Sequence, residues 1–483
     1  MSTELIMLTK GIDYYTFLDT EDCRVTFCAS NLTPVSYCAS FPMCKGNFQI
    51  PGGKFAWKAE NADGILYTGF AEINPLVGNL SRSNLNNMMS TKSIITPKYS
   101  LSYGFYDCGM RTAANFLTNQ EKSYVYLTHN YSEWMKDLAR KNPQFLDRPL
   151  NVLALAGAHD AGMFETFNFK SLLKNEDFSN KFQLHIADSL AYSSTNFSDV
   201  SNYLERIVIN LACTQKDDIS TMLDLGIRYF DFRPGYCYEP FRDLSGIQHK
   251  IFHQHAFIPG YLFYDFLCDI FKWLAAHPEE IVVVNLNFQG FEEASMKPNI
   301  EDLVKLVQNA QLDTNTRNIA IGGKENLNET IRLLLNESKR LIFLNQIDVD
   351  SDALKYDSYN DEIYATIDVN DILTALDRMQ WCQPKDDTYT VLQLQGTASA
   401  DIKACSTSIL DAMSLGSSDA MSLLMSNKAA FDNSTYPWLW SNVSNEFSPN
   451  SLLVFLNDFV DNALVKHAID ITCKRIYLWP NNT

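Results

Sequence analysis

The stretch Asn151–Gly162, NVLALAGAHDAG, decides the predicted fold of this chain. An apolar run, Val152–Ala156, is followed at once by small residues and by the pair His159 and Asp160. A continuous apolar run bounded by glycine is typical of a strand that is buried on both faces. His159 and Asp160 would then lie just past the carboxyl end of this strand, where barrels and open α/β sheets place their chemistry.

Downstream of this stretch, apolar strands alternate with amphipathic helices, which is typical of an α/β domain. The clearest helix is expected over Leu262–Ala276, followed by Pro278, and the long connection Met163–Ser220 is expected as an insertion over the barrel mouth. About eight strands over roughly 330 residues predict a distorted TIM-type barrel. The expected strands are Asn151–Ala156, Ile227–Arg233, Lys250–His255, Ile281–Asn287, Arg340–Asn345, Tyr364–Asp368, Tyr389–Gln395 and Leu452–Asn457.

The N-terminal part of the chain lacks helical periodicity. It shows short alternating runs such as Arg24–Phe27, Lys54–Trp57 and Gly64–Phe70, separated by turns rich in Gly, Pro and Asn. This pattern predicts an all-β unit, a sandwich or a jelly roll. We therefore expect a β-rich domain over residues 1–128, which could serve as a binding module, and a barrel domain over residues 129–483 with its insertion at 163–220.

Composition narrows the classes of partner. The 483 residues are 46% hydrophobic and carry a net charge of −18, which argues against nucleic acid and against electrostatic docking on anionic lipid. Any membrane contact would have to be transient and made through apolar residues or a local basic patch. No run of about twenty apolar residues predicts a transmembrane segment. The N-terminus lacks a signal-peptide pattern, which favours a cytoplasmic location, with unconventional secretion or a processed secreted form as alternatives.

The cysteines favour a reducing compartment. There are eleven, an odd number, and most are scattered. Cys23, Cys28, Cys38 and Cys44 cluster near the N-terminus and could form two disulfides or a metal site. Their spacing matches no zinc pattern, so we expect small buried thiols.

The second expected strand carries two ionisable residues. In Leu225–Gly235, LGIRYFDFRPG, Asp231 and Arg233 are two positions apart and so point to the same face. Ionisable groups that face a barrel interior are costly unless they are paired or functional. The pair is therefore either a structural salt bridge, or Arg233 is a cation that binds a phosphate in a bidentate fork.

Two further strands end in residues that can transfer or orient a proton. His253 and His255, in FHQHAF, face the same side of the third expected strand, and we expect one of them to be a core or surface residue. The last expected strand ends in Asp458. A carboxylate there could orient an imidazole, or it could cap the following helix.

The expected strands thus bring a set of polar residues to one end of the barrel: His159, Asp160, Arg233, one of His253 and His255, and Asp458. Two histidines and an arginine suit the cleavage of a phosphodiester. One histidine removes a proton from an attacking hydroxyl, and the other protonates the leaving oxygen. The arginine stabilises the charge that develops on phosphorus in place of a metal. No cage of clustered carboxylates is evident, so neither a metal nor another cofactor is expected.

At this point the chain resembles the phosphatidylinositol-specific phospholipase C X-domain family, and within it the metal-independent bacterial-type branch. The resemblance covers roughly residues 132–475, about seven-tenths of the chain. The matching features are Trp134-Met135 before the first strand, AGAHDAG at Ala156–Gly162, Leu225–Gly235, the histidine that ends strand three, HPEEIVVVNL at His277–Leu286, and LNDF at Leu456–Phe459.

The resemblance implies a distorted TIM barrel that cleaves phosphatidylinositol or a related inositol phospholipid. In that family an adjacent inositol hydroxyl attacks phosphorus, which releases diacylglycerol and a cyclic phosphate. By resemblance, His159 is the general base and Asp458 orients it. His255 is the general acid, assisted by Asp160, and Arg233 binds the phosphate.

The motifs also depart from the family pattern. The histidine of strand three is usually followed by Gly, whereas Ala256 follows His255 here, so His253 stays a rival for the acid. After strand four the bacterial enzymes carry a Lys, whereas this chain has Asn287 in Asn-Leu-Asn, which weakens inositol recognition. Asp231 matches the family's Asp two residues before the arginine. Asp231, His253 and Asn287 are therefore candidate substrate-binding residues.

Two other functions remain open from the sequence. The barrel could be the scaffold of a non-catalytic, toxin-like protein that binds lipid or glycan. It could also be a metal-dependent glycerophosphodiesterase or a sphingomyelinase D-like enzyme. Those barrels need a Glu-x-Asp metal pair after the first histidine, and the second strand offers Asp231-x-Arg233 instead.

Overall fold

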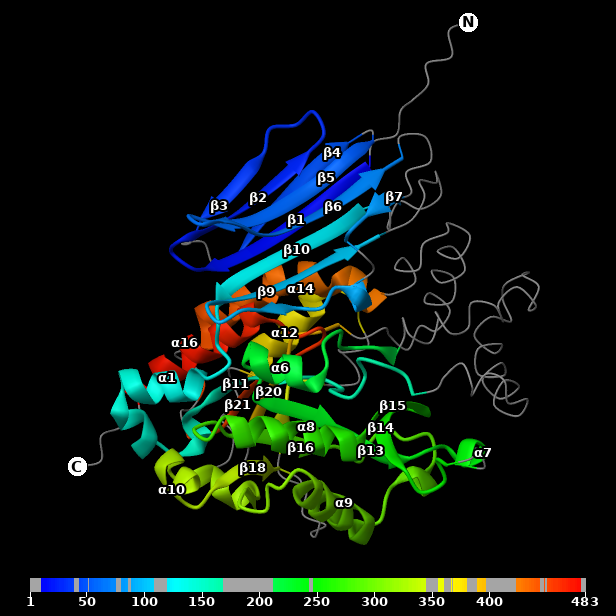
Figure 1. Ribbon diagram of the computed structural model, residues 1–483, viewed down its shortest axis with the longest axis vertical. Helices are drawn as coiled ribbons and strands as arrows, with labels where there is room; N and C mark the ends of the chain where they lie inside the picture. The colour runs from blue at the N-terminus through cyan, green and yellow to red at the C-terminus, as the bar shows by residue number, and fades with distance from the viewer. Residues whose placement is uncertain are drawn as a thin grey trace, which may run out of the picture.

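The computed structural model of the chain is shown in Figure 1. Its strands from the first part of the chain lie at one end, and the α/β part lies at the other. Helices α14 (Leu423–Trp438) and α16 (Asn462–Leu478) lie between them. The structure describes residues 10–38, 43–50, 52–74, 80–85, 88–107, 120–167, 212–242, 246–344, 355–359, 366, 368–379, 389–396, 423–443, 447 and 450–478.

The α/β part is built on a curled parallel sheet of eight strands. All of its recorded pairings are parallel. Its central strands are apolar runs buried on both faces, as the sequence predicts for a parallel sheet. Between the described residues no pairing joins the two edge strands, so the sheet is a half-barrel. In spatial order the strands are β17 (Ala320–Gly322), β18 (Lys339–Phe343), β16 (Val282–Leu286), β12 (Tyr229–Phe232), β11 (Ala154–Ala158), β21 (Leu453–Asn457), β20 (Tyr389–Gln393) and β19 (Lys355–Asp357).

The prediction that Lys250–His255 is a strand of the barrel is wrong. Lys250–His255 forms β14 (Ile251–His255), which pairs antiparallel with β13 (Pro234–Tyr236) and β15 (Ile258–Leu262) in a separate three-stranded sheet. His255 pairs with Ile258 across the two residues between them, and so short a connection forms a hairpin that cannot join parallel strands.

Other strand expectations differ in detail. The strands β17 and β19 were not predicted, because three residues are too few to show a period. The first strand begins later than expected, since Leu150–Val152 forms a 3₁₀ turn. Most of Tyr364–Asp368 and residues 168–211 of the expected insertion lie outside the described residues.

Helices cover the parallel sheet. The expected helix over Leu262–Ala276 is confirmed as α8 (Phe263–Ala276), which buries its apolar stripe and ends just before Pro278. Among the described residues, no helix is both long and apolar enough to cross a membrane. The other helices of this part are α1 (Trp134–Lys141), α6 (Ile219–Leu225), α7 (Glu239–Arg242), α9 (Ile300–Asp313), α10 (Ile331–Asn336) and α12 (Val369–Met379).

The first part of the chain forms two five-stranded sheets, in agreement with a β-rich unit. An aromatic core that includes Phe27, Phe55 and Trp57 lies between them. One sheet has the order β4 (Cys44–Ile50), β1 (Lys10–Asp19), β10 (Gln120–His129), β9 (Tyr99–Tyr106) and β8 (Ile94–Ile95). The other has the order β3 (Val35–Cys38), β2 (Cys23–Ala29), β5 (Gly53–Asn61), β6 (Gly64–Ile73) and β7 (Leu80–Ser83).

The four N-terminal cysteines are free thiols rather than disulfides. Only Cys23 among them is buried, and Cys38 is exposed, so the expectation of buried thiols holds for one of the four. The edge strand β3 explains the exposure of Cys38, because it has a partner on one side only.

The sheet that contains β10 is buried on both faces. Val125 and Leu127 belong to the core between the two N-terminal sheets. Tyr124 and Tyr126 instead belong to the core of the α/β part. Because side chains alternate along a strand, β10 contributes to both cores, and the N-terminal sheets pack directly on the α/β part.

A buried ion pair holds the start of β12. Arg228 is fully buried and donates to Glu280 Oε2 from Nε at 3.0 Å and from Nη2 at 2.8 Å. Nη1 donates to the carbonyl oxygen of Leu223, and the guanidinium lies 4.4 Å from the ring centre of Trp273. The contacts of Arg228 therefore join the start of β12, which precedes Arg233, to α6 and to the segment just before β16.

We predict that Arg228→Met lowers the free energy of unfolding by about 3–5 kcal/mol, because it leaves the Glu280 carboxylate buried without its partner. The double variant Arg228→Met/Glu280→Gln should regain most of this loss. Chemical denaturation measures both. The matched control is Arg332→Met, which removes an exposed ion pair with Asp147 and should cause no measurable change. Equal losses in the two single variants would contradict the prediction.

Candidate active site

The predicted polar residues meet around one carboxylate, that of Asp160, which is fully buried. Arg233 Nε lies 2.9 Å from Asp160 Oδ1, and His253 Nε2 lies 3.4 Å from the same oxygen. On the other oxygen, Oδ2, His159 Nε2 approaches to 3.6 Å and His255 Nε2 to 3.8 Å. The structure thus brings together an arginine and three histidines at the carboxyl ends of β11, β12 and β14.

His159 and Asp458 form a hydrogen-bonded pair. They follow β11 and β21, which are neighbours in the parallel sheet, and His159 Nδ1 lies 2.8 Å from Asp458 Oδ1. With the proton on Nδ1 directed at Asp458, Nε2 faces the centre of the cluster. The alternative role of Asp458 as a helix cap falls to Asp461, whose Oδ1 accepts the N–H of Leu464.

The two histidines of β14 differ in access. His253 is completely buried, and its Nδ1 accepts the backbone N–H of Arg233 at 3.2 Å, so the neutral ring carries its proton on Nε2, toward Asp160. The His255 side chain is 33% exposed. His255 can therefore meet a substrate, whereas His253 lies beneath the site and supports Arg233 and Asp160.

Asp231 does not pair with Arg233 as a structural salt bridge would require, since the recorded ion pair of Arg233 is with Asp160. Asp231 Oδ1 instead accepts Asn285 Nδ2 at 2.7 Å, and Tyr389 donates to Asn285 Oδ1 at 3.3 Å. These three buried residues form a hydrogen-bonded row inside the half-barrel.

Asn287 lies farther along the chain after β16. Its side-chain oxygen accepts the backbone N–H of Gln289, which shapes a turn at the carboxyl end of the strand. Its contact with a substrate stays a prediction.

Sequence reasoning missed two residues that hold the His159 backbone. Gln215 Nε2 donates to the carbonyl oxygens of His159 (2.8 Å) and Asn457 (3.1 Å), and Thr214 Oγ1 donates to that of His159 at 3.2 Å. Both are buried and lie in the long connection between the first two strands of the sheet. No motif or period marks them, so the sequence held no signal for this role.

Backbone strain is concentrated beside the site. Asp160, Ala256 and Phe459 have φ angles of +43°, +55° and +47°, in the left-handed region that side chains other than glycine seldom adopt. Ala256 directly follows His255, and its left-handed backbone lies in the two-residue connection between β14 and β15.

Close packing also restricts the site at Gly162. A Cβ atom at this position would lie 2.3 Å from the Cβ of His253. Such a contact is not tolerated, so only glycine lets the chain after His159 pass this close to β14.

Burial and neighbouring charges determine which histidine of the site is protonated. Burial by itself would lower the pKa of His159, but the carboxylates of Asp160 and Asp458 raise it to about 9. Burial lowers the pKa of His255 to about 4, although Asp160 opposes this shift. Burial would raise the pKa of Asp160, yet Arg233 and His159 hold it well below its usual range. At neutral pH the free protein therefore carries its proton on His159 and leaves His255 neutral.

One set of residues could also hold a cation. Ligand atoms of His159, Asp160 and Asp231 lie within 4.8 Å of one another. The Arg233 guanidinium already contacts Asp160, and a metal ion would have to displace it or share that carboxylate.

No protein-family model matches this chain. The mouse protein named PI-PLC X domain-containing protein 1 is 29% identical to it over 160 residues, which are 33% of this chain and 40% of that protein. The human protein of that name is 29% identical over 173 residues (35% of this chain and 46% of the relative), and the zebrafish protein is 26% identical over 198 residues (36% and 50%). The matched segments thus span half or less of the length of these curated relatives.

Among solved structures, the chain is similar to bacterial phosphatidylinositol-specific phospholipases C. A variant of the enzyme from Staphylococcus aureus matches with a TM-score of 0.42 and 15% identity, over 71% of this chain and 96% of that one. The enzyme from Listeria monocytogenes matches with a TM-score of 0.40 and 14% identity, over 71% and 98%.

We predict that the His159 ring titrates with a midpoint near pH 9, followed by its NMR resonances, and that Asp458→Asn moves this midpoint toward the ordinary value of 6.5. Since the pKa is raised on folding, protonated His159 stabilises the fold fully below pH 6.5, and this contribution is lost as the pH rises through about 9. A midpoint near 6.5 in the unsubstituted protein would contradict the described cluster.

Proposed function

We propose that this protein is a phosphodiesterase of the phospholipase C type that cleaves phosphatidylinositol or a related inositol phospholipid without a metal ion. The observation that carries the proposal is that His159 Nε2 and His255 Nε2 both lie within 4 Å of one oxygen of Asp160, with Arg233 on the other oxygen. Two proton-transfer groups and one guanidinium thus converge at the carboxyl ends of the strands. The curated relatives and the similar solved structures carry names that point to the same substrate class.

In the proposed reaction, a hydroxyl adjacent to the phosphodiester attacks phosphorus. A new O–P bond forms as one histidine takes the hydroxyl proton, and the P–O bond to the lipid alcohol breaks as the other histidine gives a proton to the leaving oxygen. The products are a cyclic phosphodiester and diacylglycerol. Arg233 donates to the phosphate oxygens and stabilises the charge that develops on them.

The roles of the histidines follow from their neighbours. His159, paired with Asp458, acts as the base, and His255, beside Asp160, acts as the acid. Because the free protein carries its proton on His159, the reactive form is the one in which this proton has moved to His255. The total charge of the site is the same in both forms, so the transfer needs no change in pH. Asp160 Oδ2 lies next to both Nε2 atoms and remains ionised throughout.

A second candidate is supported by the ligand atoms of His159, Asp160 and Asp231, which could bind a divalent cation. In that case the protein is a metal-dependent glycerophosphodiesterase or a sphingomyelinase D-like enzyme. The guanidinium of Arg233 beside Asp160 favours the metal-free function, because it already supplies the positive charge that a metal would bring.

We predict that the protein releases a cyclic inositol phosphate from phosphatidylinositol in the presence of EDTA, which ³¹P NMR detects. Phosphatidylcholine, sphingomyelin and glycosylated inositol lipids are assayed alongside it as alternative substrates. His159→Ala should lower kcat by about 10²–10⁴-fold, the usual loss on removal of a general base. His249→Ala is the matched control, because His249 is exposed and should leave activity unchanged. Turnover that appears only with added metal would support the second candidate, and no turnover on any of these lipids would contradict the proposed function.

A substrate with a good leaving group distinguishes the proposed roles of His159 and His255. A p-nitrophenyl phosphodiester of inositol releases an anion that needs no proton, so His255→Ala should regain most of the about 10²–10⁴-fold loss that it shows on the lipid. His159→Ala should not recover, because the attacking hydroxyl still requires a base. Recovery of His159→Ala instead would reverse the two roles.

A further inference from the structure

Asn457 contacts both members of the His159–Asp458 pair. Its side-chain Oδ1 accepts the backbone N–H of Asp458 at 2.9 Å, and its own carbonyl oxygen accepts the N–H of His159 at 3.1 Å. A displacement of Asn457 would therefore move the imidazole and the carboxylate that orients it.

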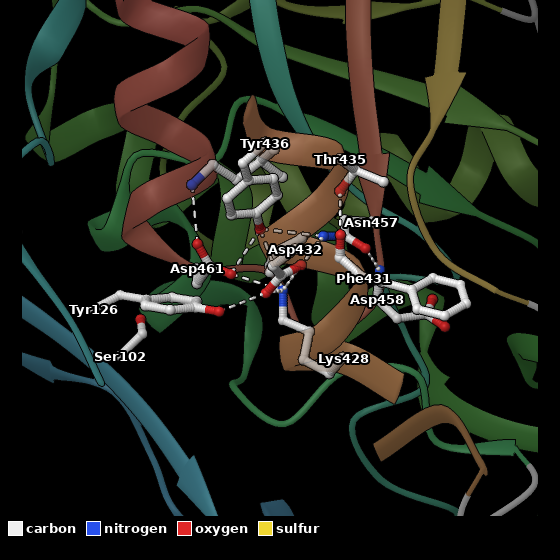
Figure 2. Close-up of polar contacts among 12 residues, drawn as sticks. Ser102, Tyr126, Lys428, Phe431, Asp432, Thr435, Tyr436, Asn457, Asp458 and Asp461 are labelled. Carbon is white, nitrogen blue, oxygen red and sulfur yellow. Dashed lines mark hydrogen bonds and ion pairs between the residues drawn. The ribbon is translucent and has the colours of Figure 1, made fainter. Parts of the chain in front are cut away.

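Asp432 of helix α14 determines how the Asn457 amide is turned (Figure 2). Asn457 Nδ2 donates to Asp432 Oδ1 at 3.0 Å and to the Tyr436 hydroxyl at 3.1 Å. An ionised carboxylate can only accept, so Asp432 requires the NH₂ side of the amide. The carbonyl side then faces the N–H of Asp458.

The N-terminal sheet holds Asp432 in turn. Tyr126 of β10 donates its hydroxyl to Asp432 Oδ2 at 3.0 Å, across 306 positions of the sequence. Lys428 Nζ lies 2.8 Å from the same oxygen and 2.7 Å from Asp461 Oδ2. All four side chains are buried, and Figure 2 shows them as one connected group between the N-terminal sheet and the end of β21.

Two other residues, Asn462 and Asp217, also connect the region around the site to the N-terminal part of the chain. Asn462 Nδ2 donates to the carbonyl oxygens of Ser100 and Tyr126 and to Thr128 Oγ1, at 2.8–3.1 Å. On the other side of His159, Asp217 accepts the N–H and hydroxyl of Ser93 at 2.9 and 2.6 Å. The segments that follow His159 and Asp458 in the chain are thus both bound to β9, β10 or the residue just before β8.

We infer that Tyr126, Asp432 and Asn457 are positioning residues, through which the N-terminal sheet holds Asp458 against His159. The inference rests on the proposed function for its effect on catalysis, but its geometric content concerns this pair alone. Buried ionic groups add little net stability because their desolvation is costly, so a role in fixing one arrangement is the better account of the Lys428–Asp432–Asp461 group. None of the three residues reaches the open face of the site, and none is assigned a chemical step.

The test compares two substitutions on one strand. Tyr126→Phe removes only the hydroxyl that binds Asp432. Tyr124→Phe, two residues before it on the same face of β10, removes a buried hydroxyl for which the described residues offer no hydrogen-bond partner. Each variant loses one hydroxyl oxygen from the same core, but only Tyr126→Phe also loses the hydrogen bond to Asp432. Asp432→Asn, which keeps the shape and loses the charge, is the stronger variant.

Two readouts are expected to change in Tyr126→Phe and Asp432→Asn and to stay unchanged in Tyr124→Phe. The downfield Nδ1 proton resonance of the His159–Asp458 hydrogen bond, identified by its loss in His159→Gln, should shift or broaden. On phosphatidylinositol, kcat should fall about tenfold in Tyr126→Phe and up to about 10²-fold in Asp432→Asn, with KM within about twofold, since small displacements of catalytic groups have costs of this size.

The resonance keeps the inference testable if the protein cleaves no lipid, because it reports the pair directly. An unchanged resonance in folded Tyr126→Phe would overturn the inference, as would an equal change in Tyr124→Phe, which would show a general effect on the core. Circular dichroism establishes folding for each variant. If Asp432→Asn does not fold, the two tyrosine variants decide the outcome alone.

Discussion

The buried carboxylate of Asp160 is the constraint on which the rest of the site depends. A fully buried charge is tolerated only with partners of opposite charge, and Asp160 has the guanidinium of Arg233 and the protonated ring of His159 within 4 Å. The neutral rings of His253 and His255 also lie within 4 Å of it. These partners come from three strand ends, which the curled parallel sheet and the β13–β14–β15 hairpin bring to one place. The same carboxylate raises the pKa of His159, so the cluster that packs the site also determines where its proton lies.

The N-terminal sheets also contact the region around this site. The sheet that contains β10 shares one face with the core of the α/β part and sends Tyr126 to the group around Asp432. Through Tyr126, Asp432 and Asn457, buried hydrogen bonds join the β-rich part to the end of β21, next to Asp458.

Much of this could be predicted from the sequence, for identifiable reasons. Long apolar runs such as those of β11, β16 and β21 predict buried parallel strands, and each polar residue that follows them was expected at the site. Short strands such as β17 show no period, and the hairpin of β14 depends on the left-handed backbone at Ala256, which the sequence does not mark. The support from Asp432 and Gln215 could not be predicted, because it consists of hydrogen bonds between residues far apart in the chain. The sequence also could not predict which histidine is protonated, since their pKa values depend on burial and on distances to charged groups.

The most direct measurement is a crystal structure of the protein with a non-hydrolysable phosphonate analogue of phosphatidylinositol, grown in EDTA. The account predicts phosphorus between His159 Nε2 and His255 Nε2, with the guanidinium of Arg233 on its oxygens and His253 still buried. A phosphonate bound elsewhere, or one that lies too far from either histidine for proton transfer, would contradict the central claim.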